Sequence, residues 1–211
     1  MSAARPAPLA VAVENLSAIP VSRRFKRAVD LCFVVSVGIP LLPLFAIIAL
    51  AIKLTSRGPV FYAQTRHGIG GRTFRAWKFR SMIVHADEIL PTHLRADPAL
   101  AEEWRSRHKL RRDPRITGLG RFLRRTSLDE LPQFWNILVG EMSLVGPRPI
   151  VAEEISRYGE AYSLYQGVLP GLTGLWQVSG RNLLSYQERV ALDLYILART
   201  VTAVLFARGA Y

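Results

Sequence analysis

The longest apolar segment of the chain extends from Leu31 to Ile52 and contains no charged residue. A helix of this length, rising about 1.5 Å per residue, matches the hydrocarbon core of a bilayer, which is about 30 Å thick. The segment begins too late in the chain, and is too long, to resemble a signal peptide. The pattern therefore predicts a membrane helix, and the alternative is a buried helix of a soluble protein.

Prolines and flanking charges argue against a simple crossing of the membrane. Pro40 and Pro43 lie near the middle of the segment, where each removes a backbone donor and bends a helix. We therefore expect a re-entrant segment, built as helix, break and helix, that enters and leaves the membrane on the same face. Positive charge at both ends supports this topology, because a single crossing usually has its positive bias on one side; the basic residues are Arg23, Arg24, Lys26, Arg27, Lys53 and Arg57.

Beyond the apolar segment the pattern becomes that of a globular domain. Residues 57–82 alternate aromatic or β-branched residues with polar ones around a glycine-rich turn, which predicts a β-hairpin. Residues 83–112 have a helical pattern with a break near Asp97, which predicts two helices. A short basic helix is expected at 121–125 and an amphipathic helix at 150–166.

These patterns predict an α+β fold with three parts. A mobile tail covers residues 1–22, the basic flank and membrane helix cover 23–56, and a small, mostly helical domain with a short β-hairpin covers 57–211. Glycine and proline mark residues 170–182 as a loop. The last helical pattern, about 185–207, becomes apolar enough at its end for a helix at the membrane interface.

The charge of the chain predicts anionic partners. Lys and Arg number 28 against 16 Asp and Glu, which gives a formal net charge of +12. Nucleic acid, anionic lipid headgroups and phosphorylated small molecules all fit such a charge. The sequence has no nucleic-acid-binding signature, so we expect no nucleic acid among the partners. The single cysteine, Cys32, allows no intramolecular disulfide.

Two adjacent carboxylates, Asp129 and Glu130, are the centre of the candidate chemistry. The segment from Ser127 to Glu130 matches the S-x-x-E capping box, so the simplest interpretation is a helix cap. A helix N-terminus also attracts phosphate. Two carboxylates suit Mg²⁺ together with a pyrophosphate, and an aspartate can act as a nucleophile that forms an acyl phosphate. The pair therefore predicts either a structural cap or a phosphoryl-transfer site that includes the cap.

Phosphoryl transfer depends mainly on positioning and on positive charge around the phosphate oxygens. Several basic residues lie in loops punctuated by glycine or proline, or close in sequence to the carboxylates. The candidates for phosphate binding are Lys78, Arg80, Arg124, Arg148 and Arg181.

The motifs resemble those of the bacterial sugar transferases, the monotopic polyprenyl-phosphate phosphoglycosyl transferases. The resemblance covers the chain from about Lys26 to Arg189 and rests on "KRAVD", "GPVFYAQTRHG", "FRAWKFRSM", "SLDELPQFWNILVGEMSLVGPRP" and "PGLTGLWQVSGRN". The segment "EEWR…KLRRDPRIT" and the ending "RGAY" are most similar to the exopolysaccharide-initiating, ExoY-like galactosyl-phosphate transferases.

The resemblance implies an enzyme, a phosphoglycosyl transferase that binds a UDP-sugar with Mg²⁺. Asp129 would attack the sugar-linked phosphate, release UMP and form a phosphosugar–aspartyl intermediate, and Glu130 would assist metal placement or proton removal. Undecaprenyl phosphate would then take the sugar phosphate, in the first step of exopolysaccharide assembly. The resemblance places the protein at the bacterial inner membrane with its catalytic domain on the cytoplasmic face. Galactose or glucose is the expected sugar, and a homodimer is left open.

Two departures from the family pattern keep a second hypothesis open. The family's re-entrant helix breaks at Ser-Pro, whereas this chain has Leu42-Pro43 with an additional Pro40. The segment after Tyr195 is also shorter than in the family. The alternative function is therefore a degenerate or non-catalytic basic module tethered to the membrane.

Overall fold

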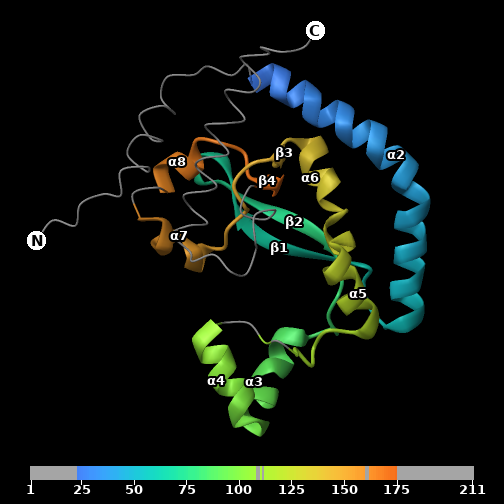
Figure 1. Cartoon of the computed structure of the whole chain (residues 1–211), viewed down its shortest axis with the longest axis vertical. Coiled ribbons are helices and arrows are strands. Elements are labelled where there is room, and N and C mark those ends of the chain that lie inside the picture. Colours follow the sequence, from blue (N-terminus) through green and yellow to red (C-terminus); the bar gives the residue numbers. More distant parts are fainter. Residues whose placement is uncertain (1–22, 108–109, 111, 160–161, 175–211) are drawn as a thin grey trace, which may run out of the picture. The chain divides into compact units, whose positions relative to one another are not determined.

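The computed structural model describes residues 23–107, 110, 112–159 and 162–174 (Figure 1). In this part of the chain, helices accompany two small two-stranded sheets, which confirms a mixed fold with one long apolar helix near the N-terminus. The predicted tail 1–22 and the predicted helix 185–207 lie outside the described residues. The chain divides into two compact units: unit 1 comprises Met1–Pro40, Gln64–Ala76 and Gln133–Tyr211, and unit 2 comprises Leu41–Ala63 and Trp77–Pro132.

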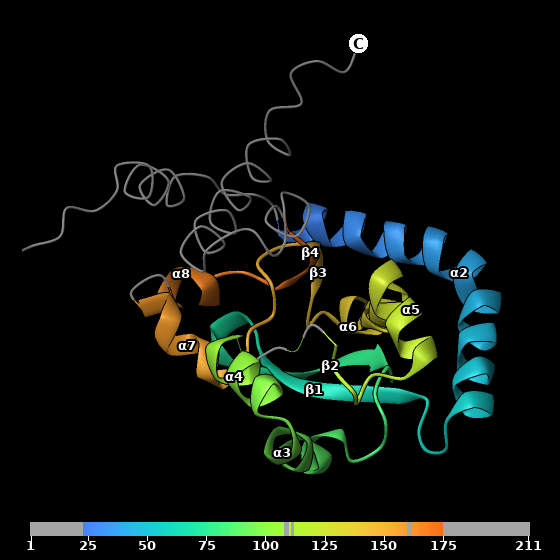
Figure 2. The same cartoon turned by 60° about the horizontal axis from the view of Figure 1, so that its bottom comes forward.

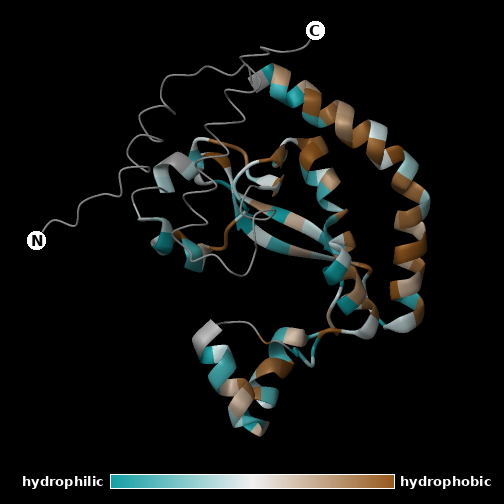
Figure 3. Ribbon diagram, viewed as in Figure 1, coloured by the Kyte–Doolittle hydropathy of each residue, from teal (hydrophilic) through white to brown (hydrophobic). Residues whose placement is uncertain are grey.

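Helix α2 (Arg23–Thr55) contains the whole apolar segment and is apolar along nearly its full length (Figure 3). Its length and composition would allow it to cross a membrane, with a hydropathy of 2.6. Only 11% of its most apolar stretch is buried, whereas the core helix of a soluble protein is mostly buried. Helical conformation continues past Pro40 and Pro43, so neither proline ends the helix. The re-entrant path remains a prediction.

The predicted hairpin is confirmed. Strands β1 (Phe61–His67) and β2 (Thr73–Phe79) form a two-stranded sheet joined through the short helix η1 (Ile69–Gly71). Gly70 and Gly71 have positive φ values of 64° and 73°, a conformation that glycine adopts without steric strain. The glycine-rich turn in the sequence therefore marks a backbone path that other residues would resist.

Unit 1 contains a second sheet that the sequence did not predict. Strand β3 (Ser143–Val145) pairs in parallel with β4 (Gly171–Thr173). The interpretation of 170–182 as a loop is therefore wrong at its start. A Cβ atom on Gly146 would lie 2.5 Å from the carbonyl oxygen of Leu169, so this glycine permits the close approach of the two segments.

Three further helices of unit 1 flank these strands in the sequence. Helix α6 (Gln133–Val139) precedes β3, and Gly140 follows it with a φ of 87°, as expected for a glycine that ends a helix. The single helix predicted at 150–166 is instead two short ones, α7 (Ala152–Tyr158) and α8 (Tyr162–Gln166). This correction shows that amphipathic spacing fixed the type of structure there but not its continuity.

The first turns of α2 are attached to unit 1 by polar side chains. The Lys26 ammonium donates to the carbonyl oxygen of Val145 at 2.8 Å, and the buried Asp30 carboxylate accepts the Leu144 N–H at 3.1 Å. Arg27 donates to the carbonyl oxygens of Ile137 and Leu138, near the end of α6. These three charged side chains, together the α2 clamp, bind backbone groups of β3 and of the last turn of α6.

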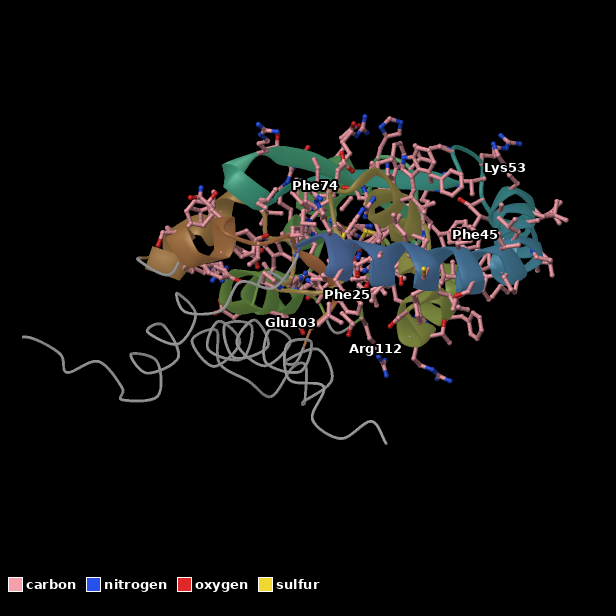
Figure 4. The ribbon with its side chains drawn as sticks, turned by 90° about the horizontal axis from the view of Figure 1, so that it is seen from above. Phe25, Phe45, Lys53, Phe74, Glu103 and Arg112 are labelled. Atoms are coloured by element: carbon pink, nitrogen blue, oxygen red, sulfur yellow. The ribbon has the colours of Figure 1, made fainter. Side chains whose placement is uncertain are left out.

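Unit 2 has an apolar core instead. Ile48 and Ile52 of α2, Phe79 of β2 and Leu123 of helix α5 (Gly118–Thr126) are buried together. Phe45, labelled in Figure 4, packs against this cluster, and its ring lies 5.4 Å from that of Phe79. Unit 2 therefore holds the C-terminal half of α2 through hydrophobic burial.

The two helices predicted in 83–112 are confirmed as α3 (Ala86–Ala96) and α4 (Pro98–Arg107). The break between them has a clear cause, because a carboxylate oxygen of Asp97 accepts the backbone N–H groups of Ala99 and Leu100 at 2.8 and 3.2 Å. This is the geometry of an N-terminal cap, with proline at the first helical position. The predicted basic helix is confirmed as α5.

Candidate functional site

Asp129 lies in unit 2, in the short 3₁₀ helix η2 (Leu128–Glu130) that follows α5. Ser127, between the two, adopts the left-handed conformation with φ 58° and ψ 15°, and its side chain makes no capping hydrogen bond. The interpretation of this segment as a capping box is therefore wrong. The carboxylates lie in a short 3₁₀ turn between α5 and α6 rather than at the start of a long helix, because the left-handed Ser127 ends α5.

The environment of Asp129 is unfavourable for a negative charge. The residue is 7% exposed. The pKa of its carboxyl is raised, and burial is the largest cause. The positive charge of Lys78 lowers this pKa, the negative charge of Glu130 raises it further, and the positive charge of Arg124 lowers it. Burial dominates because a carboxylate loses the solvation of water there. The Asp129 carboxylate is therefore poorly solvated and has two cationic side chains near it. Such an environment suits a nucleophile, or a ligand for a metal cation that accompanies an anionic substrate.

Lys78 and Glu130 form an ion pair in the candidate site. The Lys78 ammonium, near the end of β2, donates to a carboxylate oxygen of Glu130 at 2.6 Å. Both side chains are about a third exposed or less, so the pair stays accessible from solvent. A partly exposed ion pair contributes little stability, on the order of 1 kcal/mol or less. Its structural consequence is to hold an ammonium group beside the two carboxylates.

Arg124 is held in place by a loop that the sequence did not single out. Its Nε donates to the hydroxyl of Ser81 at 2.8 Å. The backbone carbonyl of Ser81 accepts the N–H of Thr117 at 3.1 Å, and Thr117 in turn caps α5 by accepting the N–H of Gly120 at 2.9 Å. A Cβ on Gly120 would lie 1.9 Å from the Ser81 carbonyl oxygen, so this contact needs glycine. Ser81 is therefore a positioning residue for Arg124.

The structure gives Arg80 a different partner from the phosphate that was predicted. Arg80 is buried, and its guanidinium donates to the carbonyl oxygens of Arg57 and Ser56 at 2.6 and 2.9 Å, just after the end of α2. Free carbonyl groups at a helix C-terminus favour a cation. Arg80 thus binds the chain that follows α2, and its role as a phosphate ligand stays a prediction.

The remaining predicted residues lie elsewhere in the chain, and their roles stay predictions. Arg148 is partly buried and belongs to unit 1, between the buried Pro147 and Pro149. Arg181 lies outside the described residues. Pro40 and Pro43 lie within α2. Unit 2 therefore unites Asp129, Glu130, Lys78 and Arg124, which come from three separate predicted motifs.

A buried ion pair near the start of α5 is a second feature that sequence reasoning missed. Arg115 donates to Asp113 through Nη2 at 2.7 Å and through Nε at 2.9 Å. Burial alone would raise the pKa of Asp113, but the hydrogen bonds from Arg115 outweigh it and hold this pKa below its ordinary value. The D-P-R spacing was the available signal, because an aspartate two residues before an arginine can form a local turn.

Asp129 and Glu130 offer two adjacent carboxylates to a magnesium ion. Among the described residues, no group of three or more His, Cys, Asp or Glu side chains could hold a metal ion. Mg²⁺ commonly binds through one or two carboxylates plus substrate phosphates, so Asp129 and Glu130 fit it when a phosphorylated substrate completes the ligand set. Glu130 would then share its carboxylate between the ion and Lys78.

Comparison with known proteins identifies the family. The family model described as "Bacterial sugar transferase" matches residues 21–205. The exopolysaccharide production protein ExoY of Sinorhizobium fredii is 43% identical over 91% of this chain and 90% of the relative. The ExoY protein of Rhizobium meliloti is 43% identical over 97% of this chain and 96% of the relative.

Longer relatives carry the same region as part of a larger protein. The UDP-galactose-lipid carrier transferase of Erwinia amylovora is 44% identical over 94% of this chain, which spans 44% of that relative. The family model covers the whole described structure, and it confirms the resemblance that the motifs predicted. The chain therefore belongs to the bacterial sugar transferase family.

Proposed function

We propose that this protein transfers a sugar 1-phosphate from a UDP-sugar to undecaprenyl phosphate, and that Asp129 is the nucleophile. Family membership supports the general reaction, since relatives are named "UDP-galactose-lipid carrier transferase" and "Undecaprenyl-phosphate galactose phosphotransferase". The observation that carries the residue assignment is the buried Asp129 carboxylate flanked by Lys78, Glu130 and Arg124.

In the first step, a carboxylate oxygen of Asp129 attacks the phosphorus that bears the sugar. The bond from that phosphorus to the bridging oxygen breaks, and UMP leaves with the bridging oxygen. Lys78 and Arg124 compensate the charge of the diphosphate, which is the main requirement of phosphoryl transfer. Burial, which raises the pKa of Asp129, also leaves its carboxylate poorly solvated, and a poorly solvated carboxylate attacks more readily.

In the second step, a phosphate oxygen of undecaprenyl phosphate attacks the phosphorus of the phosphosugar–aspartyl intermediate. The bond to the Asp129 oxygen breaks, which restores the carboxylate and gives an undecaprenyl-diphosphate-linked sugar. Glu130 assists by metal placement or by accepting a proton. Mg²⁺, when bound, supplies positive charge that offsets the charge of the phosphates.

The location follows from the lipid substrate. An apolar, mostly exposed α2 fits a protein that works at a bilayer. We propose that α2 enters the membrane and returns to the same face around Pro40 and Pro43, and that the catalytic domain faces the cytoplasm. Galactose or glucose is the proposed sugar, because relatives named as galactose and as glucose-1-phosphate transferases are among the similar proteins.

A UMP-release assay tests the reaction and the intermediate separately. The purified chain in detergent is given a panel of UDP-sugars with Mg²⁺, with and without undecaprenyl phosphate. We expect turnover with both substrates, and a stoichiometric burst of UMP from the UDP-sugar alone, with the phosphosugar mass retained on the protein. Asp129→Asn should lose both signals almost completely, because the amide keeps the shape but not the nucleophile.

Glu102→Gln is the matched control, since Glu102 is an exposed carboxylate of α4 paired only with Arg105 among the described interactions. Turnover without any burst would overturn the aspartyl intermediate while leaving the overall reaction standing. No UMP release with any sugar, in the original chain as in Asp129→Asn, would instead favour the non-catalytic tethered module.

A further inference from the structure

Residues 78–81, at the end of β2, contact several different parts of unit 2, and we call them the β2 end segment. Lys78 donates to Glu130, and the hydroxyl of Ser81 accepts a hydrogen bond from Nε of Arg124. Phe79 lies between these residues and is buried in the apolar core. Two side chains of this segment therefore contact the candidate site, and a third fixes the segment in the core.

Arg80 joins the β2 end segment to the end of α2. Its guanidinium donates to the carbonyl oxygens of Ser56 and Arg57, and its backbone N–H donates to the carbonyl oxygen of Val60 at 2.8 Å. The guanidinium also needs glycine at position 58, because a Cβ on Gly58 would collide with Nη1 of the arginine. One residue therefore makes three hydrogen bonds to the short connection between α2 and β1.

The burial of Arg80 costs free energy. The residue is 7% exposed, and no carboxylate pairs with it among the described residues. The two carbonyl groups and the negative end of the α2 dipole offset part of the solvation that the guanidinium loses. Arginine is almost never this buried without an acidic partner, and such departures from local rules occur most often at functional sites. The contact therefore calls for a role beyond ending a helix.

The contacts of Ser81 extend this connection to the helix that carries Arg124. The carbonyl oxygen of Ser81 accepts the N–H of Thr117, and a β-bridge joins the next residues of the two segments, Met82 and Ile116. Thr117 caps α5, which leads directly into the carboxylate turn η2. Figures 1 and 2 both show the end of β2 close to α5 and to the C-terminal half of α2. A displacement of the β2 end segment would therefore also displace the start of α5.

We propose that Arg80 is a positioning residue for the transfer reaction. By holding the β2 end segment against the end of α2, it sets the place of Lys78 and, through Ser81, the place of Arg124. These are the two cations that lie near the Asp129 carboxylate. The proposal rests on the proposed function for the roles of these cations. It assigns to Arg80 an effect that acts through them, and no contact with the diphosphate of the substrate.

Steady-state UMP release by the full chain in detergent tests this role. Arg80→Met keeps the aliphatic length of the side chain and removes its donors. We expect kcat to fall about tenfold or more and KM for the UDP-sugar to change less than about threefold, because displaced cations stabilise the transition state less well. Arg80→Lys keeps the charge and should recover part of the loss. Arg95→Met is the matched control, since Arg95 also donates to a backbone carbonyl, that of Pro91 at 3.2 Å, but on exposed α3.

Hydrogen exchange distinguishes a positioning role from a simple helix cap, and it does not depend on turnover. The Ser56 amide donates to Ile52 at the end of α2, whereas the Thr117 amide donates to Ser81 at the start of α5. We expect Arg80→Met to lower the protection of both amides and Arg95→Met to lower neither. A loss of protection at Ser56 alone would overturn the proposal, because Arg80 would then only cap α2.

Gly58→Ala tests the same contact from its other side, because the added Cβ displaces the guanidinium while Arg80 itself remains. We expect the same fall in kcat and the same loss of protection at Thr117. A raised KM with kcat kept in Arg80→Met would overturn the proposal in favour of direct binding of the diphosphate, and an unchanged kcat in both variants would also overturn it. Failure of every protein to release UMP, with Thr117 protection still dependent on Arg80, would count against the reaction and not against the connection.

Discussion

The two halves of α2 are attached to the protein in different ways. The N-terminal half is held by the α2 clamp, in which Lys26, Arg27 and Asp30 bind backbone groups of β3 and α6. The C-terminal half is held by the burial of Ile48 and Ile52 among apolar side chains. The first attachment is directional and depends on a few hydrogen bonds, whereas the second depends on area removed from water.

This difference shows how an apolar helix can serve both a membrane and a folded domain. A charged side chain at a turn of α2 is stable when the domain supplies its partner, and Asp30 is buried for that reason. Apolar side chains can face either lipid or core. The α2 clamp therefore determines which turns of the N-terminal half of α2 contact the folded domain. In the C-terminal half, the buried and exposed faces are both apolar, and only packing decides which of them contacts the core.

The largest expected effect tests the apolar attachment. Ile52→Ala should lower the free energy of unfolding by about 2–5 kcal/mol, because Ile52 is 2% exposed and its removal leaves a cavity. Leu54→Ala is the matched control on the same helix, since Leu54 is 78% exposed, and it should change stability by about 0.5 kcal/mol or less. Denaturant unfolding in detergent gives both values. Equal effects of the two variants would refute the role of burial here.

A smaller effect is expected at the clamp. Asp30→Ala leaves the Leu144 N–H without its acceptor and should lower stability by about 1–3 kcal/mol. Asp30→Asn retains a side-chain oxygen at the same place and should recover much of the loss. Hydrogen exchange of the Leu144 amide provides a local readout, with protection lost in the alanine variant and kept in the asparagine variant. Unchanged protection in Asp30→Ala would show that the clamp does not hold β3.

The smallest expected effect concerns Asp129, whose pKa is raised above its ordinary value of 3.8 by burial. Because the folded state then holds this proton more tightly than the unfolded chain, stability falls as pH rises from about 3.8 through the raised pKa, and the loss is constant above it. Asp129→Asn removes the ionisation and should therefore raise Tm at neutral pH. The gain should shrink as the pH falls below the raised pKa.

Thermal unfolding of both proteins across this pH range, in the presence of a metal chelator, measures the difference. A Tm gain that is equally large at acidic pH would mean that the carboxylate's charge is not its cause. Unlike Asp30, Asp129 is held at a cost to stability, which is common for residues whose environment serves chemistry.

Local patterns in the sequence predicted the local structure well. Alternating residues around Gly70 and Gly71 predicted the hairpin, and Asp97 before Pro98 predicted the break between α3 and α4, because these residues set the backbone conformation of their own turns. The S-x-x-E pattern failed at Ser127, where a left-handed residue ends α5 and removes the capping geometry.

The sequence by itself determined the apolar α2, the hairpin, the helices α3, α4 and α5 and, through its motifs, the family and the carboxylate pair. Only the tertiary structure decided which partners the charged side chains meet. Lys78 and Arg80 lie two residues apart, yet one reaches Glu130 and the other reaches the carbonyl groups after α2. The pairing of β3 with β4 was equally hidden. The physical reason is that these contacts join segments distant in the chain, and no local conformational preference records their approach.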